Sequence, residues 1–329
     1  MSEIQSLDPS HQNVTVDNTD DVVKTNRHRR RIASYLKWQS WPPLLLYPPI
    51  IPTIIKLCIR YRTTPAIIMA ANPLFTYGGL PFDSKSRMQD HFSRVLPYQQ
   101  LPKQDNLNKR IEIGQSFTST YGFPVIIKPD TGHRGVGVVL CHNESQLNQQ
   151  LIKQTWDLMI QAYSDLPCEY GVFFMKKPGD VAGNIVSLTK KIIPSCMVNP
   201  VASHNRGAIF VDFMDQVTPQ LVHAVNEVVG DKPFYFGRFD VKSPSDQDLQ
   251  LGKFSIIEIN GATAEFIHIY DDRISWYLAM RELKRQWALL FDIASHSQRV
   301  HVQTHTWGTF CRRYIQFFKQ TKQAEGIFW

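Results

Sequence analysis

The sequence predicts a fold of the α/β (α+β) class, in which short strands alternate with helices from residue 123 onward. The first observation is a series of runs rich in β-branched and aromatic residues, most of them continuously apolar, as expected for strands covered on both faces. The second is an amphipathic helix among these runs, and the third is helical periodicity after Asp271. A chain of 329 residues with 43% hydrophobic content can bury a core of this kind.

The strand signal recurs along the middle of the chain, and one helix between the strands has clear boundaries. The expected strands span residues 124–128, 137–141, 158–162, 169–175, 184–189, 208–213, 234–241 and 254–259. The helix is capped by Thr218, has Pro219 in its first turn and ends at Gly230, which are residue types preferred at those positions. After Asp271, apolar residues recur at helical spacing, so the chain is expected to be helical to its end.

The chain is expected to divide into a disordered basic arm, a segment before the main domain, the main domain itself and a helical C-terminal extension. The expected divisions are 1–36, 37–100, 101–272 and 273–329. In the second division, residues 64–71 predict one short strand. Ser84 is expected to cap a helix that extends toward Val95.

The apolar segment 41–59 is interrupted by five prolines and charged at Lys56, so no continuous membrane-spanning helix is expected there. The prolines also argue against a regular amphipathic helix, and we therefore expect residues 44–59 to pack against the core. The basic arm with Trp38 and Trp41 leaves open a peripheral membrane contact, an alternative that we do not favour. The polar, acidic start of the chain predicts no cleavable signal peptide.

Composition narrows the classes of partner and compartment. The formal charge of +7 lies largely in the arm, at Lys24, Arg27, Arg29, Arg30, Arg31 and Lys37. The rest of the chain is much less basic, so no nucleic-acid partner is expected. The five cysteines are odd in number, scattered and without a CxxC spacing, which indicates neither a disulfide framework nor a zinc site. A reducing cytoplasm is the expected location, and the oligomeric state is left open.

A strand that ends in a lysine is followed at once by a glycine-rich turn. Lys128 can meet phosphate oxygens there, while Gly132, Gly135 and Gly137 let backbone N–H groups approach without side chains in the way. The lysine precedes the glycines, so this is not a Walker motif. The pattern indicates phosphate binding, and a plain β-hairpin is the alternative.

Acidic and amide side chains end two neighbouring strands later in the chain. Asp240, Glu258 and Asn260 are expected at one end of the sheet, and the last two share a face because they are two residues apart. Carboxylate and amide oxygens, completed by phosphates and water, suit magnesium. Arg238 faces the same way as Asp240 and can neutralise charge on a transferred phosphoryl group. A buried ion pair between Arg238 and a carboxylate is the alternative.

The two constellations, in this order and at this separation, resemble a known family. The segments FPVIIKPDTGHRGVGV, GRFDV and IIEING are together similar to motifs of the ATP-grasp superfamily, in particular of bacterial proteins similar to D-alanine:D-alanine ligase. The resemblance covers residues 84–271. It implies the ATP-grasp fold, in which two α/β subdomains clasp ATP, here with a short N-terminal segment and a C-terminal helical extension.

The resemblance implies a role for each residue of the two constellations. Lys128 would hold the α- and β-phosphates of ATP, and the loop 130–138 would fold over the triphosphate through Gly132, Arg134, Gly135 and Gly137. Magnesium would be held by Asp240, Glu258 and Asn260. Arg238 would face the reacting phosphoryl group.

Other positions match the family outside these two constellations. Lys85 matches an earlier lysine that is directed at phosphate, and Glu169 stands where the family has an acid that binds the ribose. The hinge strand whose backbone pairs with adenine corresponds to Ile160, Gln161, Ala162 and Tyr163. Of the neighbours Lys190 and Lys191, we choose Lys190 as a further phosphate-contacting lysine, with a solvated pair as the alternative. Glu265 and His268 lie where such ligases have the acceptor-binding loop.

The chain departs from the family at two places. Relatives often carry a glutamate at the position of Ala162, and the segment 189–205 is shorter than in many of them. The resemblance implies an ATP- and magnesium-dependent ligase that activates a small-molecule carboxylate as an acyl phosphate for capture by an amine or thiol. A nucleotide-binding regulatory protein without turnover and an ATP-grasp kinase are the alternatives. The identities of carboxylate and acceptor are left open.

Overall fold

The computed structural model describes residues 38–41, 43–132, 135–154, 156–193, 208–301 and 306–328. The chain divides into two units, Met1–Leu46 and Tyr47–Trp329. The described part of the first unit holds η1 (Trp38–Ser40) and α2 (Pro43–Leu46). The expected basic arm, residues 1–36, lies outside the described residues, so its disorder stays a prediction. All that follows concerns the second unit.

A four-stranded antiparallel sheet forms the first layer of this unit. Its strands, in the order β1-β4-β2-β3, are β1 (Tyr98–Leu101), β4 (Leu158–Ala162), β2 (Val125–Pro129) and β3 (Val139–Cys141). The strands expected in this region are confirmed to within two residues. Their β-branched and aliphatic runs explain this, because such residues favour strands.

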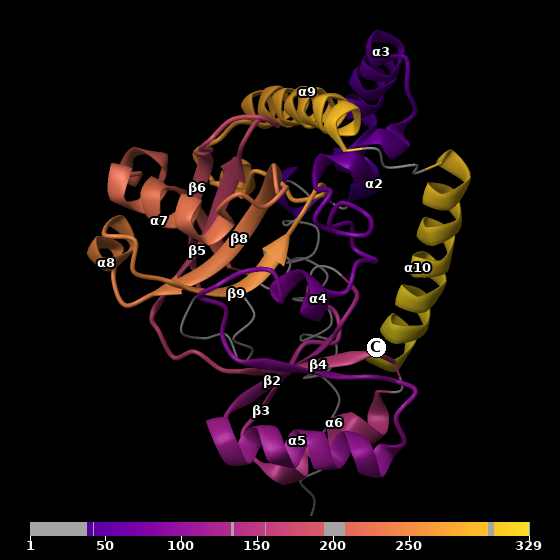
Figure 1. The fold of residues 1–329 in the computed structure, drawn as a ribbon, viewed down its shortest axis with the longest axis vertical. Coiled ribbons are helices and arrows are strands. Elements are labelled where there is room, and N and C mark those ends of the chain that lie inside the picture. Colours follow the sequence, from indigo (N-terminus) through magenta and orange to yellow (C-terminus); the bar gives the residue numbers. More distant parts are fainter. Residues whose placement is uncertain are drawn as a thin grey trace, which may run out of the picture. The chain divides into compact units, whose positions relative to one another are not determined.

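Two helices cover one face of the four-stranded sheet, as Figure 1 shows: α5 (Leu107–Tyr121) and α6 (Glu144–Lys153). Each begins at an asparagine, Asn106 or Asn143, whose side chain accepts a hydrogen bond from a backbone N–H of the first turn. Their apolar residues pack with every second residue of the strands, in a core that contains Phe117, Leu147, Leu151, Val125, Ile127 and Ile160. Side chains at the alternate positions, Lys128 among them, therefore point away from these helices.

A five-stranded antiparallel sheet forms the second layer. Its strands, in the order β7-β6-β5-β8-β9, are β7 (Ile209–Asp212), β6 (Asn184–Ile192), β5 (Cys168–Met175), β8 (Phe236–Ser243) and β9 (Ser255–Asn260). The five strands expected between residues 169 and 259 are all present. Figure 1 shows α7 (Pro219–Val229) and α8 (Asp246–Gln250) on one side of this sheet.

The helix α7 has the boundaries that its sequence predicts. The Thr218 side chain accepts a hydrogen bond from the backbone N–H of Leu221, Pro219 occupies the first turn and Gly230 ends the helix at φ +60°. Its apolar side chains join the largest core, with Tyr170, Val172, Phe174, Phe239 and Val241 of the sheet. One face of the five-stranded sheet is thus apolar and covered, which leaves the opposite face for the polar residues.

Two expectations for the segment before residue 101 are wrong. Residues 65–71 of the segment 64–71 form a 3₁₀ helix, η3 (Pro65–Ala71), and not a strand. The helix begins at Pro65, and its other six residues are buried. Its contacts with α9 replace strand pairing. Ser84 does cap α4 (Lys85–Gln89), but this helix stops at Gln89, and Val95 bridges to Ile256 of β9 instead.

The expectation that prolines prevent a regular helix between residues 44 and 59 is also wrong. The short η2 (Pro48–Ile50) leads into α3 (Ile51–Tyr61), an 11-residue α-helix. Pro52 lies in the first turn, where its missing N–H costs no hydrogen bond. Among the described residues, no helix is long and apolar enough to cross a membrane.

The C-terminal extension is helical, as expected. It consists of α9 (Trp276–Val300), which Ser275 caps, and α10 (Trp307–Phe328). Leu283 and Leu290 of α9 are buried, while Trp276 at its start is 39% exposed. Two 3₁₀ turns, η5 (Met214–Gln216) and η6 (Ile267–Tyr270), complete the unit.

Candidate functional site

The uncovered face of the five-stranded sheet gathers charged side chains from four strands. Strand register sets this arrangement: Glu169 lies opposite Lys191, Asp240 opposite Glu258, and Arg238 opposite Asn260. Gly171 of β5 pairs with Thr189 of β6 on one side and with Asp240 of β8 on the other. Because side chains alternate between faces, these residues all point away from the core that α7 covers.

Asp240 is the centre of this cluster. Its carboxylate, 4% exposed, accepts hydrogen bonds from Arg238 Nε at 2.7 Å and from Asn260 Nδ2 at 3.3 Å, and it lies 3.2 Å from Lys191 Nζ. Burial opposes its ionisation, but the positive charges of Arg238 and Lys191 outweigh burial and hold the pKa of Asp240 below its usual range. Asp240 is therefore a buried anion between two cations.

Lys191, and not Lys190, joins the cluster. Lys191 is 7% exposed and donates a hydrogen bond to Oε1 of Glu169 at 2.9 Å. Lys190 points to the opposite face, where its Nζ lies 2.7 Å from both carboxylate oxygens of Asp246. Lys190, which we chose, lies outside the cluster because two neighbours in a strand face opposite ways, and its contact with phosphate stays a prediction.

Lys128 reaches the cluster from the four-stranded sheet. Its Nζ donates to Oε1 of Gln161 at 2.8 Å and to the carbonyl oxygen of Ile257 at 3.2 Å. The register of β8 and β9 shifts at Ile257, so this residue bulges out of the ladder and turns its carbonyl toward the other sheet. Burial lowers the pKa of Lys128 to about 8, although Glu258 partly opposes the shift.

A buried polar chain continues from Lys128 into α4. Gln161 Nε2 donates to Oε1 of Gln89 at 3.4 Å. Gln89 is 1% exposed, and its own Nε2 is buried with no hydrogen-bond partner among the described residues. An unsatisfied buried donor carries a free-energy cost, so this atom is suited to an acceptor on a bound molecule.

Lys85 and the glycine-rich turn lie on the other side of Glu258. Lys85 Nζ is 3.5 Å from Oε1 of Glu258 and donates to the carbonyl of Gly132 at 2.7 Å. Gly135 and Gly137 adopt φ of +70° and +74°, a region in which a side chain is strained, so the turn requires glycine there. Arg134 lies outside the described residues, and its contact with phosphate stays a prediction.

In the strand expected to pair with adenine, residues 160–163, two backbone N–H groups bind other parts of the protein. The backbone N–H of Ala162 donates to the carbonyl of Pro97 at 2.9 Å, and that of Tyr163 to the carbonyl of Pro124 at 3.4 Å. These two N–H groups therefore have protein partners, and the pairing of the hinge backbone with adenine stays a prediction. Lys242 Nζ lies 5.6 Å from the centre of the Tyr163 ring.

Two glycine segments in close contact hold the end of β9 in place. A Cβ on Gly261, the residue after Asn260, would lie 2.4 Å from the carbonyl oxygen of Gly78 and 2.5 Å from the Cα of Gly79. The N–H of Ala262 also donates to the Gly78 carbonyl at 2.9 Å. The turn at Gly78 thus sets the position of Asn260, and only glycine allows the approach.

Asp240, Glu258 and Asn260 fit magnesium by donor chemistry. Two carboxylates directly opposite each other on β8 and β9, with an amide two residues further on, supply the oxygen donors that this ion prefers. The part of the chain that the structure describes holds no group of three His, Cys, Asp or Glu placed for a metal. The third protein donor would thus have to be the Asn260 amide.

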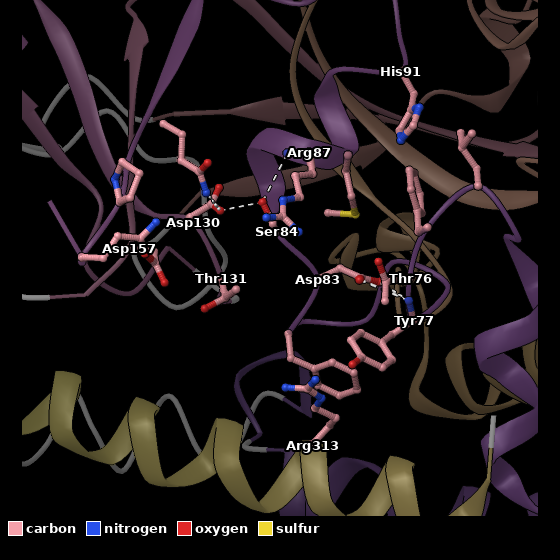
Figure 2. Close-up of a pocket in the computed structure, with 17 residues that line it drawn as sticks. Thr76, Tyr77, Asp83, Ser84, Arg87, His91, Asp130, Thr131, Asp157 and Arg313 are labelled. Carbon is pink, nitrogen blue, oxygen red and sulfur yellow. Dashed lines mark hydrogen bonds between the residues drawn. The ribbon is translucent and has the colours of Figure 1, made fainter. Parts of the chain in front are cut away.

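Figure 2 shows a cavity of about 500 Å³, which Thr131 of the glycine-rich turn helps to line. Ser84, Arg87, Asp130 and Thr131 line one side, next to Lys85 and Gly132 in the sequence. Asp83 also lines the cavity, and its carboxylate accepts hydrogen bonds from the backbone N–H groups of Gly79 and Tyr77. Burial nevertheless raises the pKa of Asp83 to about 6. Further lining residues include His91, Gln100, Asp157 and, from α10, Arg313.

The two candidates for an acceptor loop have structural partners. The carboxylate of Glu265 accepts hydrogen bonds from the hydroxyls of Tyr47 and Tyr270, and its backbone carbonyl accepts one from Arg238. His268 Nδ1 lies 2.7 Å from the hydroxyl of Ser187, and burial lowers the His268 pKa. Glu265 therefore adjoins the cluster through its backbone.

Sequence reasoning passed over Lys191 in favour of Lys190 and did not single out Gln89. The sequence did hold a signal for Lys191. Leu188 and Lys190 are two residues apart in a strand and therefore share a face, and the apolar Leu188 indicates that this is the core face. Lys191 then shares the polar face with Thr189. No such signal marked Gln89, whose position depends on the end of α4. The segment 189–205, which we expected to be shortened, lies outside the described residues from residue 194 onward, so its length effect stays a prediction.

Comparisons with known proteins found one family model and several solved structures. Residues 95–175 match the family model of the RimK-like ATP-grasp domain. Among solved structures, the chain is similar to D-alanine-D-alanine ligase from Helicobacter pylori, at 14% identity over 64% of this chain and 60% of that chain, with a TM-score of 0.41. A comparison with curated proteins found no match.

Two further solved structures are similar to the chain. The biotin carboxylase domain of 2-oxoglutarate carboxylase from Hydrogenobacter thermophilus is 16% identical over 64% of this chain and 45% of that chain, with a TM-score of 0.44. D-alanine-D-alanine ligase from Bacillus anthracis, complexed with ATP, is 14% identical over 66% of each chain, with a TM-score of 0.41. The chain thus spans less than two thirds of the length of these three structures.

Proposed function

We propose that this chain, which resembles the ATP-grasp superfamily and has its fold, is an ATP- and magnesium-dependent ligase. It would activate a small-molecule carboxylate as an acyl phosphate, which an amine or a thiol then captures. The observation that carries the proposal is the convergence of Lys128, Lys191 and Lys85 on the carboxylates of Asp240 and Glu258. Lysines beside carboxylates that can bind a metal ion suit a polyphosphate that binds together with a divalent cation.

The lysines would bind and orient the triphosphate. Lys128, held by Gln161 and the Ile257 carbonyl, would contact the α- and β-phosphates, and Lys191 would take the role that we first gave to Lys190. The turn with Gly135 and Gly137 would cover the phosphates with backbone N–H groups. Adenine would pair with the backbone beyond Tyr163, and Glu169 would accept from the ribose.

Magnesium would be held by Asp240, Glu258 and Asn260, where it would offset the repulsion between the phosphates and the carboxylate substrate. Arg238 would remain beside Asp240 and face the transferred phosphoryl group. Because Arg238 is anchored to Asp240 and to the Glu265 carbonyl, its guanidinium is positioned before the substrate binds.

The reaction would proceed in two steps that need no nucleophile on the protein. A carboxylate oxygen attacks the γ-phosphorus, the bond to the β,γ-bridging oxygen breaks, and ADP leaves. The amine or thiol then attacks the acyl carbon, and phosphate leaves with one oxygen of the original carboxylate. The protein contributes position and charge neutralisation, which is the main source of catalysis in phosphoryl transfer.

The cavity of Figure 2 is our candidate for the entry of the carboxylate substrate. It borders Thr131 of the glycine-rich turn, and Arg87 and Arg313 on its walls can pair with a carboxylate. Its acidic walls at Asp130 and Asp157 suit a substrate that also carries an amine. An amino acid or a similar zwitterion is therefore the proposed substrate class.

The test is ADP release in the presence of pooled carboxylates and amines, with the carboxylates labelled with ¹⁸O. A ligase transfers one ¹⁸O into inorganic phosphate and forms a product with the mass of an amide or thioester. A phosphorylated product without free phosphate would indicate a kinase, and ATP binding without ADP release would indicate a regulatory protein. We place the protein in the cytoplasm, since the four described cysteines are free thiols.

A further inference from the structure

The helix α3 carries a stripe of exposed isoleucines. Ile51, Ile55 and Ile59 are 51%, 54% and 73% exposed, and their spacing of four residues aligns them along one side of the helix. The opposite side holds Leu57, 6% exposed, and Tyr61, which donates to Asp292 of α9 at 3.2 Å. The helix is thus anchored to the body by one face and presents the other outward.

Basic side chains flank this stripe. Lys56 and Arg60 are exposed and each follows an isoleucine of the stripe, so they lie beside it, and Arg62 caps the end of the helix. The helix contains no aspartate or glutamate between Ile51 and Tyr61. An apolar stripe bordered only by positive charge is complementary to a surface that offers hydrocarbon below a layer of phosphates.

The length of α3 decides between lying on a membrane and crossing it. Its 11 residues extend about 16 Å at the usual rise per residue, roughly half of a bilayer's hydrocarbon thickness. The exposed face of the helix can therefore enter the interface, and the helix cannot span. Single exposed apolar side chains are common on proteins, whereas an aligned set over all turns of one helix marks an interaction surface.

We propose that α3 is a docking surface for an anionic lipid membrane. Ile51, Ile55 and Ile59 enter the headgroup boundary, and Lys56 and Arg60 pair with lipid phosphates. The proposal does not depend on the reaction that the protein catalyses. It reverses the expectation that residues 44–59 are buried against the core, because α3 forms despite the prolines and buries only one of its faces.

The test is flotation of the full chain with vesicles of phosphatidylcholine, with and without phosphatidylglycerol. We expect the wild type to float with the anionic vesicles and to stay largely bound at about twice physiological salt, where the Debye length is roughly 6 Å. The double variant Ile55→Gln/Ile59→Gln should bind about tenfold more weakly or worse. Lys56→Gln/Arg60→Gln should lose most of the preference for anionic vesicles.

The matched control is Ile152→Gln, on α6, which removes an isoleucine of 61% exposure without touching α3. It should bind vesicles as the wild type does. Each variant should keep the wild-type melting temperature, since the changed side chains face solvent. Absence of vesicle binding by the wild type overturns the proposal, whether or not α3 mediates self-association. Unchanged binding of the isoleucine variant also overturns it, because the basic arm then accounts for the attraction.

Discussion

The ammonium nitrogen of Lys191 lies 3.2 Å from Oδ1 of Asp240. Both side chains are buried, and the same nitrogen donates a hydrogen bond to Glu169 at 2.9 Å. Lys191 of β6 is thus linked to the central strand β5 and, beyond it, to β8. The adjacent Lys190 makes its ion pair with Asp246 on the other face. Two neighbouring lysines thus offer a matched pair of variants, one inside the proposed site and one outside it.

We expect Lys191→Met to weaken ATP binding by about 10- to 100-fold, the loss typical of a charge-assisted hydrogen bond that goes unmade. It should also lower the free energy of unfolding by about 3 kcal/mol, because Glu169 and Asp240 lose a buried partner. Lys190→Met should change ATP affinity less than about twofold, because its ion pair is partly exposed and contributes little. Calorimetric titration with ATP measures both, and equal affinities for the two variants would remove Lys191 from the site.

Asp240 and Glu258 should differ in what they contribute to stability. Asp240→Asn leaves Arg238 and Lys191 with one buried anion fewer, and we expect a loss of about 3 kcal/mol. Glu258 has a side chain that is 32% exposed and a longer contact with Lys85, so Glu258→Gln should change stability by less than about 1 kcal/mol. Urea unfolding of the two variants provides the comparison. A larger loss for Glu258→Gln would contradict the ion-pair geometry.

ATP affinity should fall as the pH rises above about 8. The free protein loses the proton of Lys128 near this pH, whereas the bound triphosphate needs the charged form, so binding above pH 8 takes up a proton. Titrations in two buffers with different ionisation enthalpies measure this uptake. Lys128→Met should bind ATP more weakly and show no proton uptake from this group. Proton uptake in that variant equal to that of the wild type would assign the titration to another residue.

The same shift has a consequence for folding, with its own sign. The unfolded chain holds the Lys128 proton up to about pH 10.5, and the folded protein only to about 8, so the unfolded state binds more protons between these values. The free energy of unfolding should therefore gain from Lys128 as the pH rises from 8 toward 10. The gain should be missing in Lys128→Met.

Gly261→Ala should destabilise the protein and disturb the end of β9. The added Cβ meets backbone atoms of Gly78 and Gly79 at 2.4–2.5 Å, which side-chain motion cannot relieve. We expect a loss of about 2 kcal/mol or more, together with weaker metal-dependent ATP binding through Asn260. Gly308→Ala is the control, since the nearest atom to its added Cβ is a side-chain oxygen at 3.8 Å. A Gly261→Ala protein with wild-type stability would mean that the turn at Gly78 moves freely.

Features that depend on local chemistry could be predicted from the sequence. Thr218, Pro219 and Gly230 each act through their own backbone or the nearest turn, and the boundaries of α7 followed from them. The strands of both sheets other than β1 followed in the same way from short apolar runs. The order in which antiparallel strands pair depends on distant segments, so the sheets themselves could not be assembled in advance.

Features that depend on register or on packing were the ones missed. The choice between Lys190 and Lys191 depended on which face of β6 meets Asp240, and pairing with β5 sets that. Residues 65–71 carry a strand-like composition but pack against α9 as a 3₁₀ helix, because tertiary burial overrides weak β propensity. For α3, the sequence argument considered the number of prolines and not their positions. Pro52 lies in the first turn of the helix, where proline is tolerated.

The most direct test of the central claim is calorimetric titration of the wild type and Glu258→Gln with ATP, each with and without magnesium. The account predicts that magnesium strengthens ATP binding to the wild type by about tenfold or more, and that Glu258→Gln loses most of this gain while it keeps its fold. Magnesium-independent binding of equal affinity in both proteins would contradict the assignment of Asp240, Glu258 and Asn260 to the metal. Absence of ATP binding to the wild type would contradict the account as a whole.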